Sequence, residues 1–142
     1  MTQPYDVEFA SQQYQEWLAA LKETASLVTH NQSQAMMRAV MHRLRRSLAP
    51  DDVLAVANAL PALPRGIFLD GWSLDEERFT PASAKAFTAA VADDLKAHHV
   101  PPDTIVADVF AVWSRHLDGR KAAIVAARLP DVLKPLWPAG SD

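Results

Sequence analysis

An internal repeat constrains this chain more than any other feature of its sequence. When the chain is compared with itself at an offset of 69 positions, as from Val40 to Val109, two stretches match without a gap: Trp17–Phe68 and Ala86–Trp137. The identical pairs are Ala20/Ala89, His30/His99, Val40/Val109, Arg46/Arg115, Leu48/Leu117, Val56/Val125, Ala57/Ala126, Leu60/Leu129 and Pro61/Pro130. Elsewhere one apolar residue replaces another, as in Met36/Ile105, Met41/Phe110 and Leu44/Trp113. Apolar character is thus kept position by position, which predicts two copies of one structural unit.

The apolar residues of each unit recur at the spacing of helices. In the clearest case the apolar residues are Met36, Met37, Val40, Met41, Leu44 and Leu48. Intervals of three and four place them on one helical face, and no segment alternates long enough to predict a strand. A single unit is too small to bury its apolar faces well. We therefore predict an all-α fold, a compact bundle of about eight helices formed by two tandem four-helix repeats with pseudo-twofold symmetry.

Polar and proline-containing segments mark the boundaries within a single domain, residues 1–142. The first repeat is expected at about 5–72, the connector at 73–80 and the second repeat at about 81–138. Asn31 or Ser33 is expected to cap the second helix, and Thr80 the fifth. Pro50 suits the first position of the third helix, because proline has no N–H to leave unpaired there.

The composition excludes several classes of protein. The chain of 142 residues has no cysteine, which rules out disulfides and thiolate metal sites and suits a reducing cytoplasm. Its net charge is −3 and its acidic and basic residues are spread evenly over both halves, so nucleic-acid binding is not expected. Neither a signal peptide nor a membrane-spanning stretch is evident. We expect a cytoplasmic protein with no nucleic acid and no membrane among its partners.

Two motifs resemble those of a known bacterial family. The first runs from Ala39 to Leu48 (AVMHRLRRSL) and continues, after Leu60-Pro61, into Arg65–Trp72 (RGIFLDGW). The second half gives Val109–Trp113 (VFAVW), then Leu129-Pro130 and Leu136–Pro138. From about Trp17 onward the chain resembles the family catalogued as domain of unknown function 2267, although Phe68-Leu69 replaces a usual tyrosine pair. The resemblance implies an all-helical fold and no established activity, cofactor or partner.

The segment Arg65–Trp72 has a structural and a functional interpretation. Gly71 is expected in the left-handed conformation beyond a helix end, with Trp72 folded back onto Ile67. In this interpretation, which we favour, Arg65 and Asp70 pair across the turn. Alternatively, Arg65, Asp70 and Trp72 form a recognition surface beside the seam between the repeats.

A basic stripe, formed by Arg38, His42, Arg45 and Arg46, lies opposite the apolar face of its helix. Such a stripe binds a phosphate or an acidic partner, or is simply a solvated face, which is the commoner case. The equivalent positions of the second unit are Ala107, Ala111, Ser114 and Arg115. That small face suits close approach of another helix, either from the first unit, which we favour, or from a second copy in a homodimer.

No catalytic or metal-binding constellation is recognisable. The five histidines lack metal-ligand spacing, so neither a metal nor a cofactor is expected. The acidic runs Asp51-Asp52, Asp75–Glu77 and Asp93-Asp94 are sequence neighbours and are not expected to share a cleft. Our leading hypothesis is therefore a non-catalytic module for protein–protein interaction. The alternative is a small-molecule-binding or sensory domain with a pocket near Arg65, Asp70 and Trp72.

Overall fold

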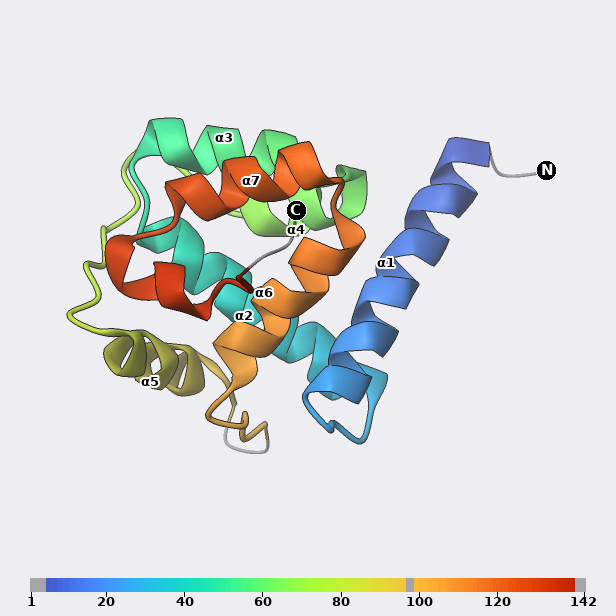
Figure 1. Cartoon of the computed structure of the whole chain (residues 1–142), viewed down its shortest axis with the longest axis horizontal. Helices are drawn as coiled ribbons and strands as arrows, with labels where there is room; N and C mark the ends of the chain where they lie inside the picture. Colours follow the sequence, from blue (N-terminus) through green and yellow to red (C-terminus); the bar gives the residue numbers. More distant parts are fainter. Residues whose placement is uncertain (1–4, 97–98, 140–142) are drawn as a thin grey trace.

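The computed structural model describes residues 5–96 and 99–139, and within these ranges the fold is all-helical (Figure 1). The helices are α1 (Tyr5–Thr24), α2 (His30–Arg46), α3 (Pro50–Ala59), α4 (Ala62–Leu69), α5 (Ala84–Asp94), α6 (Ile105–His116), α7 (Gly119–Arg128) and the 3-10 helix η1 (Asp131–Leu136). No strand occurs in the described part of the chain. The predicted all-α bundle of about eight helices is confirmed.

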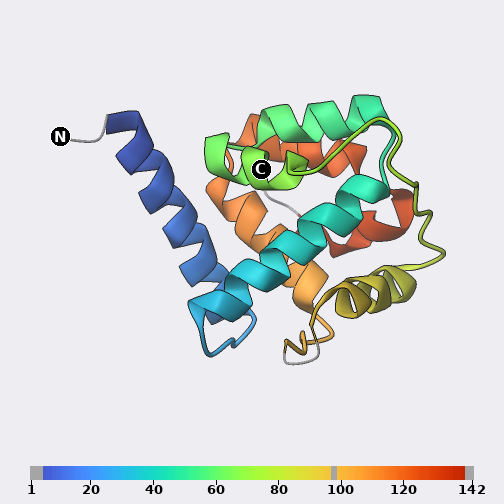
Figure 2. The ribbon, with the colours of Figure 1, turned by 180° about the vertical axis from the view of Figure 1, so that it is seen from behind.

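Helix α2 lies at the centre of the arrangement. It packs against α1, α4, α5 and α6, whereas α3 lies along α7 on one side of the bundle, as Figures 1 and 2 show. Helix α6 packs against α1 and α2 of the first unit, and the small residues on its second face, Ala107, Ala111 and Ser114, are half-buried. Helix α2, which carries the basic stripe, is thus surrounded by other helices, so residues of the stripe can contact them as well as solvent.

The apolar stripe of α2 forms the middle of one hydrophobic core. Met36, Met37 and Met41 are fully buried, and so are their counterparts Ile105, Val106 and Phe110 on α6. At the crossing of these helices the Trp113 indole N–H donates to the sulfur of Met37 at 3.3 Å. Burial of this apolar surface from both helices is the main force that holds the two units together.

Several helix bounds repeat at the offset of the sequence repeat. Helices α3 (Pro50–Ala59) and α7 (Gly119–Arg128) correspond end to end, because 50 and 59 plus 69 give 119 and 128. The last elements differ: α4 is an α-helix, whereas η1 is a 3-10 helix that contains Pro135. Proline lacks the N–H that an α-helix would use there, which explains the difference. Duplication with pseudo-twofold symmetry stays a prediction.

Two predicted helix starts are wrong by a few residues. Helix α2 is capped by Thr29, which forms a capping box with Gln32, and not by Asn31 or Ser33. Ser33 is instead buried inside the helix and donates its hydroxyl to Leu18 O at 2.7 Å. Helix α5 is capped by Ser83, which accepts from the backbone N–H of Ala86, and not by Thr80.

The late start of α5 has a visible cause. The backbone N–H of Phe79 donates to Arg46 O, and the ring of Phe79 packs at 6.5 Å from that of Phe87. These contacts fix Phe79 outside a helix, and α5 begins only after Ser83. The predicted start of the third helix at Pro50 is confirmed. No described helix is long and apolar enough to span a bilayer.

Candidate functional site

A groove runs along the polar face of α2, between the connector and the end of α5. Its volume is about 750 Å³. We call it the α2 groove; its charged and titratable lining residues are Arg38, His42, Arg45 and Arg46 from α2, Glu76 and Glu77 from the connector, and Asp94, Lys96 and His99 from α5 and the loop after it. The groove therefore contains the whole predicted basic stripe. It also brings together acidic residues that were predicted not to share a cleft, because the fold of the connector over α2 is not visible in the sequence.

Arg45 is buried, which contradicts the solvated-face interpretation for this residue. Its side chain is only 6% exposed and forms an ion pair with Glu76, with Nε and Nη2 donating at 3.1 and 2.5 Å. Its Nη1 donates to Phe68 O at 2.9 Å and to Asp70 O at 2.8 Å, both at the end of α4. Carbonyls at a helix C-terminus have no partner within the helix, so Arg45 supplies it. The role of Arg45 is structural.

Arg38 and His42 also bind the last turn of α4. Arg38 forms a 2.6 Å ion pair with Asp70, and this guanidinium holds the pKa of the Asp70 carboxyl below its usual value. His42 donates from Nε2 to Ile67 O at 2.7 Å. Burial lowers the pKa of His42, opposed by that hydrogen bond, so the neutral imidazole is favoured at its place in the groove.

Arg46 is the residue of the basic stripe whose side chain forms no ion pair with a described residue. Its Nε is buried and has no hydrogen-bond partner in the described part of the chain. A buried donor without a partner costs about 1–3 kcal/mol. Nearby, Lys96 lines the groove and makes no ion pair with a described residue. Arg46 and Lys96 together give the groove two positive groups that form no ion pair with the described residues.

Another arginine, Arg43, which the sequence analysis missed, stabilises one wall of the groove. Arg43 forms a bidentate pair with Asp94, at 2.8 and 2.5 Å, and its guanidinium lies 4.8 Å from the centre of the Phe79 ring. This arrangement joins α2 to α5 and to the connector. The periodicity of α2 places Arg43 beside the stripe, but the partner 51 residues away has no sequence signal.

Arg65 and Trp72 lie outside the α2 groove. The Arg65 side chain donates to Ala57 O and Leu60 O, each at 2.9 Å, so it caps the end of α3. The predicted pair between Arg65 and Asp70 is wrong, because Asp70 pairs with Arg38 and Arg65 donates to the carbonyls at the end of α3. Trp72 is half-buried, packs against the core and borders a hollow of only about 160 Å³.

The predicted left-handed conformation of Gly71 is confirmed, with φ +77°. Asp70 has φ −58° and ψ 119°, and the Trp72 N–H donates to Leu69 O at 2.9 Å. Together these angles and this bond define a type II turn from Leu69 to Trp72 that follows α4, rather than a helix-capping motif. The turn delivers the Asp70 carboxylate to Arg38.

The charged groups of the groove can bind a ligand. Among the described residues, no three His, Asp or Glu side chains are grouped as a set of metal ligands. The acidic side chains Glu76 and Asp94 are held by arginines. Among the lining groups, the uncommitted positive charges Arg46 and Lys96 exceed the single remaining negative charge of Glu77. The arrangement is suited to hold an anionic group.

A family model described as an uncharacterized conserved protein (DUF2267) matches residues 14–136, which include all the residues that line the α2 groove. No curated protein matches the sequence.

Proposed function

The chain belongs to the DUF2267 family, and we propose from its own residues that it is a non-catalytic binding module that recognises an anionic group in the α2 groove. The observation that carries the proposal is Arg46, whose Nε is buried at this groove without a partner. A bound anion would pair with the charged guanidinium of Arg46, which lines the groove. The group is a phosphate or carboxylate, carried by a small molecule or by an acidic segment of another protein.

The dimensions of the groove support a ligand larger than a single ion. It extends along α2 from Asn31 to Arg46, and fifteen steps at about 1.5 Å each correspond to a length of roughly 22 Å. The volume of about 750 Å³ is within the range of ligand-binding clefts. The groove lies between the first unit and the start of the second, where the sequence hypothesis placed a ligand, but Arg46 and Lys96 replace Arg65 and Trp72 as its contacts.

The fixed ion pairs on the walls favour selective binding. Arg45 with Glu76 and Arg43 with Asp94 are formed before any ligand arrives, so the walls need little reordering on binding. Arg46 is then the donor that gains most, because a charged guanidinium donates to an oxyanion more strongly than neutral donors do. The net charge of −3 opposes a long polyanion, so nucleic acid is not the proposed ligand.

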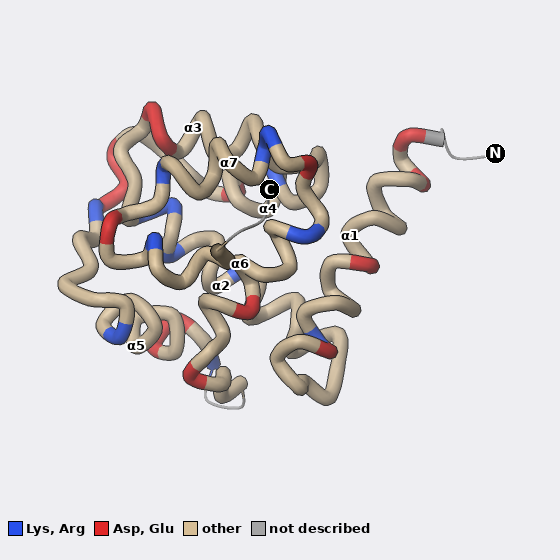
Figure 3. Tube along the Cα trace, viewed as in Figure 1, with Lys and Arg blue, Asp and Glu red and all other residues tan. Residues whose placement is uncertain are grey.

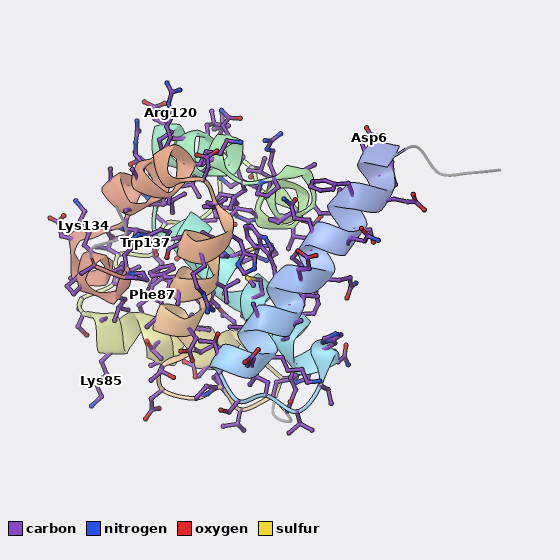
Figure 4. The ribbon with its side chains drawn as sticks, turned by 45° about the vertical axis from the view of Figure 1, so that its right-hand side comes forward. Asp6, Lys85, Phe87, Arg120, Lys134 and Trp137 are labelled. Carbon is purple, nitrogen blue, oxygen red and sulfur yellow. The ribbon has the colours of Figure 1, made fainter. Side chains whose placement is uncertain are left out.

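Calorimetric titration of the full chain tests the proposal. The probes are pyrophosphate, for a small anion, and a short peptide rich in glutamate, for an acidic protein segment. We expect one of them to bind, and Arg46→Gln to weaken that binding roughly tenfold, or about 1.4 kcal/mol. Arg120→Gln on α7 is the matched control, because Arg120 is exposed and lies away from the groove (Figure 4).

Either of two results would contradict the proposal: no binding of either probe, or equal losses in Arg46→Gln and Arg120→Gln. Binding of pyrophosphate alone would identify a small-molecule ligand, and binding of the peptide alone would identify a protein partner. We also propose a cytoplasmic location, supported by the absence of cysteine. Fractionation of the source cells would test it.

A further inference from the structure

A second hollow, which we call the α1–α4 cleft, shares Arg38 with the α2 groove but is otherwise lined by different residues. Helix α1 packs on the bundle through its second half, while its first turns, from Asp6 onward, project beside α4 (Figures 1 and 4). The cleft has a volume of about 540 Å³, and its apolar lining comes from Val7 and Ala10 of α1 and from Leu63, Gly66 and Ile67 of α4. It is an open surface bounded by two helices.

Two apolar residues that line the cleft are exposed. Val7 is 47% exposed and Leu63 is 38% exposed. Apolar groups gathered in an open hollow mark a surface that another molecule covers.

Gly66 provides an independent observation. A glycine within a helix costs about 1 kcal/mol relative to alanine, so it needs a packing or functional reason. Gly66 lies inside α4, and a Cβ added to it would meet no atom within 4 Å. Its φ is not positive, so backbone conformation does not demand glycine either. No described part of the fold requires a glycine here, whereas an occupant of the cleft that approaches α4 closely would.

The charges around the cleft indicate the chemistry of the occupant. Asp6 and Asp70 lie on its two rims, and Arg38, its basic lining residue, is neutralised by Asp70. Figure 3 shows the acidic positions along α1; Asp6 is the one that lines the cleft, whereas Glu8 and Glu16 lie on other faces of the helix. A second copy of α1 would bring like charges together. A basic helix would be attracted.

We propose that the α1–α4 cleft docks an amphipathic helix of another protein, with an apolar stripe against Leu63 and Gly66 and with lysine or arginine beside Asp6. This is the helix-in-groove mode of recognition, in which apolar residues at intervals of three and four are the anchors. Close approach at Gly66 lets the two helix backbones come together. The proposal is independent of the anion in the α2 groove.

Fluorescence anisotropy with labelled peptides tests the docking. The probe is an amphipathic peptide of about 18 residues, five helical turns, with leucines on one face and lysines on the flanks. A second peptide has the same composition with its leucines scattered around the helix, and a third has glutamate in place of lysine. We expect the first peptide to bind at least tenfold more tightly than either of the others.

Substitutions at Gly66 separate docking from folding. Gly66→Leu fills the cleft and is expected to weaken peptide binding at least tenfold while leaving the melting midpoint unchanged or higher, because leucine favours helix. Gly119→Leu is the matched control, since Gly119 also lies in a helix with no atom within 4 Å of an added Cβ. Leu63→Ser, with Ile124→Ser as a control of equal exposure (38% and 39%), gives a second comparison.

Three results would overturn the proposal. The first is equal binding of the ordered and scattered peptides, and the second is no effect of Gly66→Leu on binding. The third is self-association in sedimentation that Gly66→Leu abolishes, which would make a second copy the occupant.

Discussion

Replacement of Arg45 by methionine should destabilise the fold more than any other change in the basic stripe. The buried guanidinium serves three groups: the Glu76 carboxylate and the carbonyl oxygens of Phe68 and Asp70. Methionine fills a similar volume but donates nothing, so all three acceptors lose their partner.

The magnitude follows from the burial of those groups. Removal of one member of a buried ion pair costs about 3–5 kcal/mol. The Glu76 side chain is 19% exposed and can recover part of its hydration, so the lower end of the range applies. A loss of about 3 kcal/mol in the free energy of unfolding corresponds, for a domain of this size, to a fall of roughly 10 °C in melting midpoint.

Urea unfolding followed by tryptophan fluorescence measures this loss. Trp17 and Trp113 are fully buried, so their emission reports the core. Arg120→Met, an exposed cation replaced in the same way, is the control and should change stability by less than about 0.5 kcal/mol. The double variant Arg45→Met/Glu76→Leu should recover part of the loss, because no charge is left unpaired. If Arg45→Met is as stable as the control, the assignment of Arg45 to a structural role is wrong.

Three further predictions follow from the same geometry. Gly71→Val should destabilise by about 1–2 kcal/mol through left-handed backbone alone, since an added Cβ meets no atom within 4 Å, and an unchanged thermal midpoint would refute this. Arg65→Met should cost about 1–2 kcal/mol by removing the donor to Ala57 O and Leu60 O, and urea unfolding checks it. His42 has a lowered pKa in the folded state, so its contribution to stability is present above about pH 6.5 and is lost as the pH falls through the lowered value. His42→Gln keeps a donor for Ile67 O without titrating there, so its unfolding free energy should vary less with pH below 6.5 than that of the wild type; equal slopes would exclude His42 as the cause.

The elements of the fold could be predicted because their signals are local. The spacing of Met36, Met37 and Met41 identifies α2 and its buried face, and Pro50 marks the start of α3. The caps were less certain, since Asn31, Ser33 and Thr29 all have suitable side chains. Only the capping box with Gln32 selects Thr29, and that signal was present in the sequence.

The sequence predicts that the four residues of the basic stripe lie together, but not what each of them does or which other residues line the groove. Arg38, His42, Arg45 and Arg46 share one helical face in the sequence, and they do share the groove. Their roles differ because the end of α4 and the connector bring carbonyl and carboxylate groups to Arg38, His42 and Arg45. Such contacts join residues 23 to 32 positions apart and depend on the tertiary fold. Arg46 forms no ion pair with a described residue.

The proposed function requires that an anionic ligand reaches Arg46 in the α2 groove. The most direct measurement is the Nε–Hε resonance of each arginine by NMR while pyrophosphate or the acidic peptide is added to the full chain. We expect a saturable shift of the Arg46 signal, with the Arg45 signal nearly constant, because Arg45 is already bound to Glu76 and to the end of α4. An Arg46 signal that stays constant up to saturating concentrations of both probes, or one that moves no more than that of Arg120, would contradict the claim.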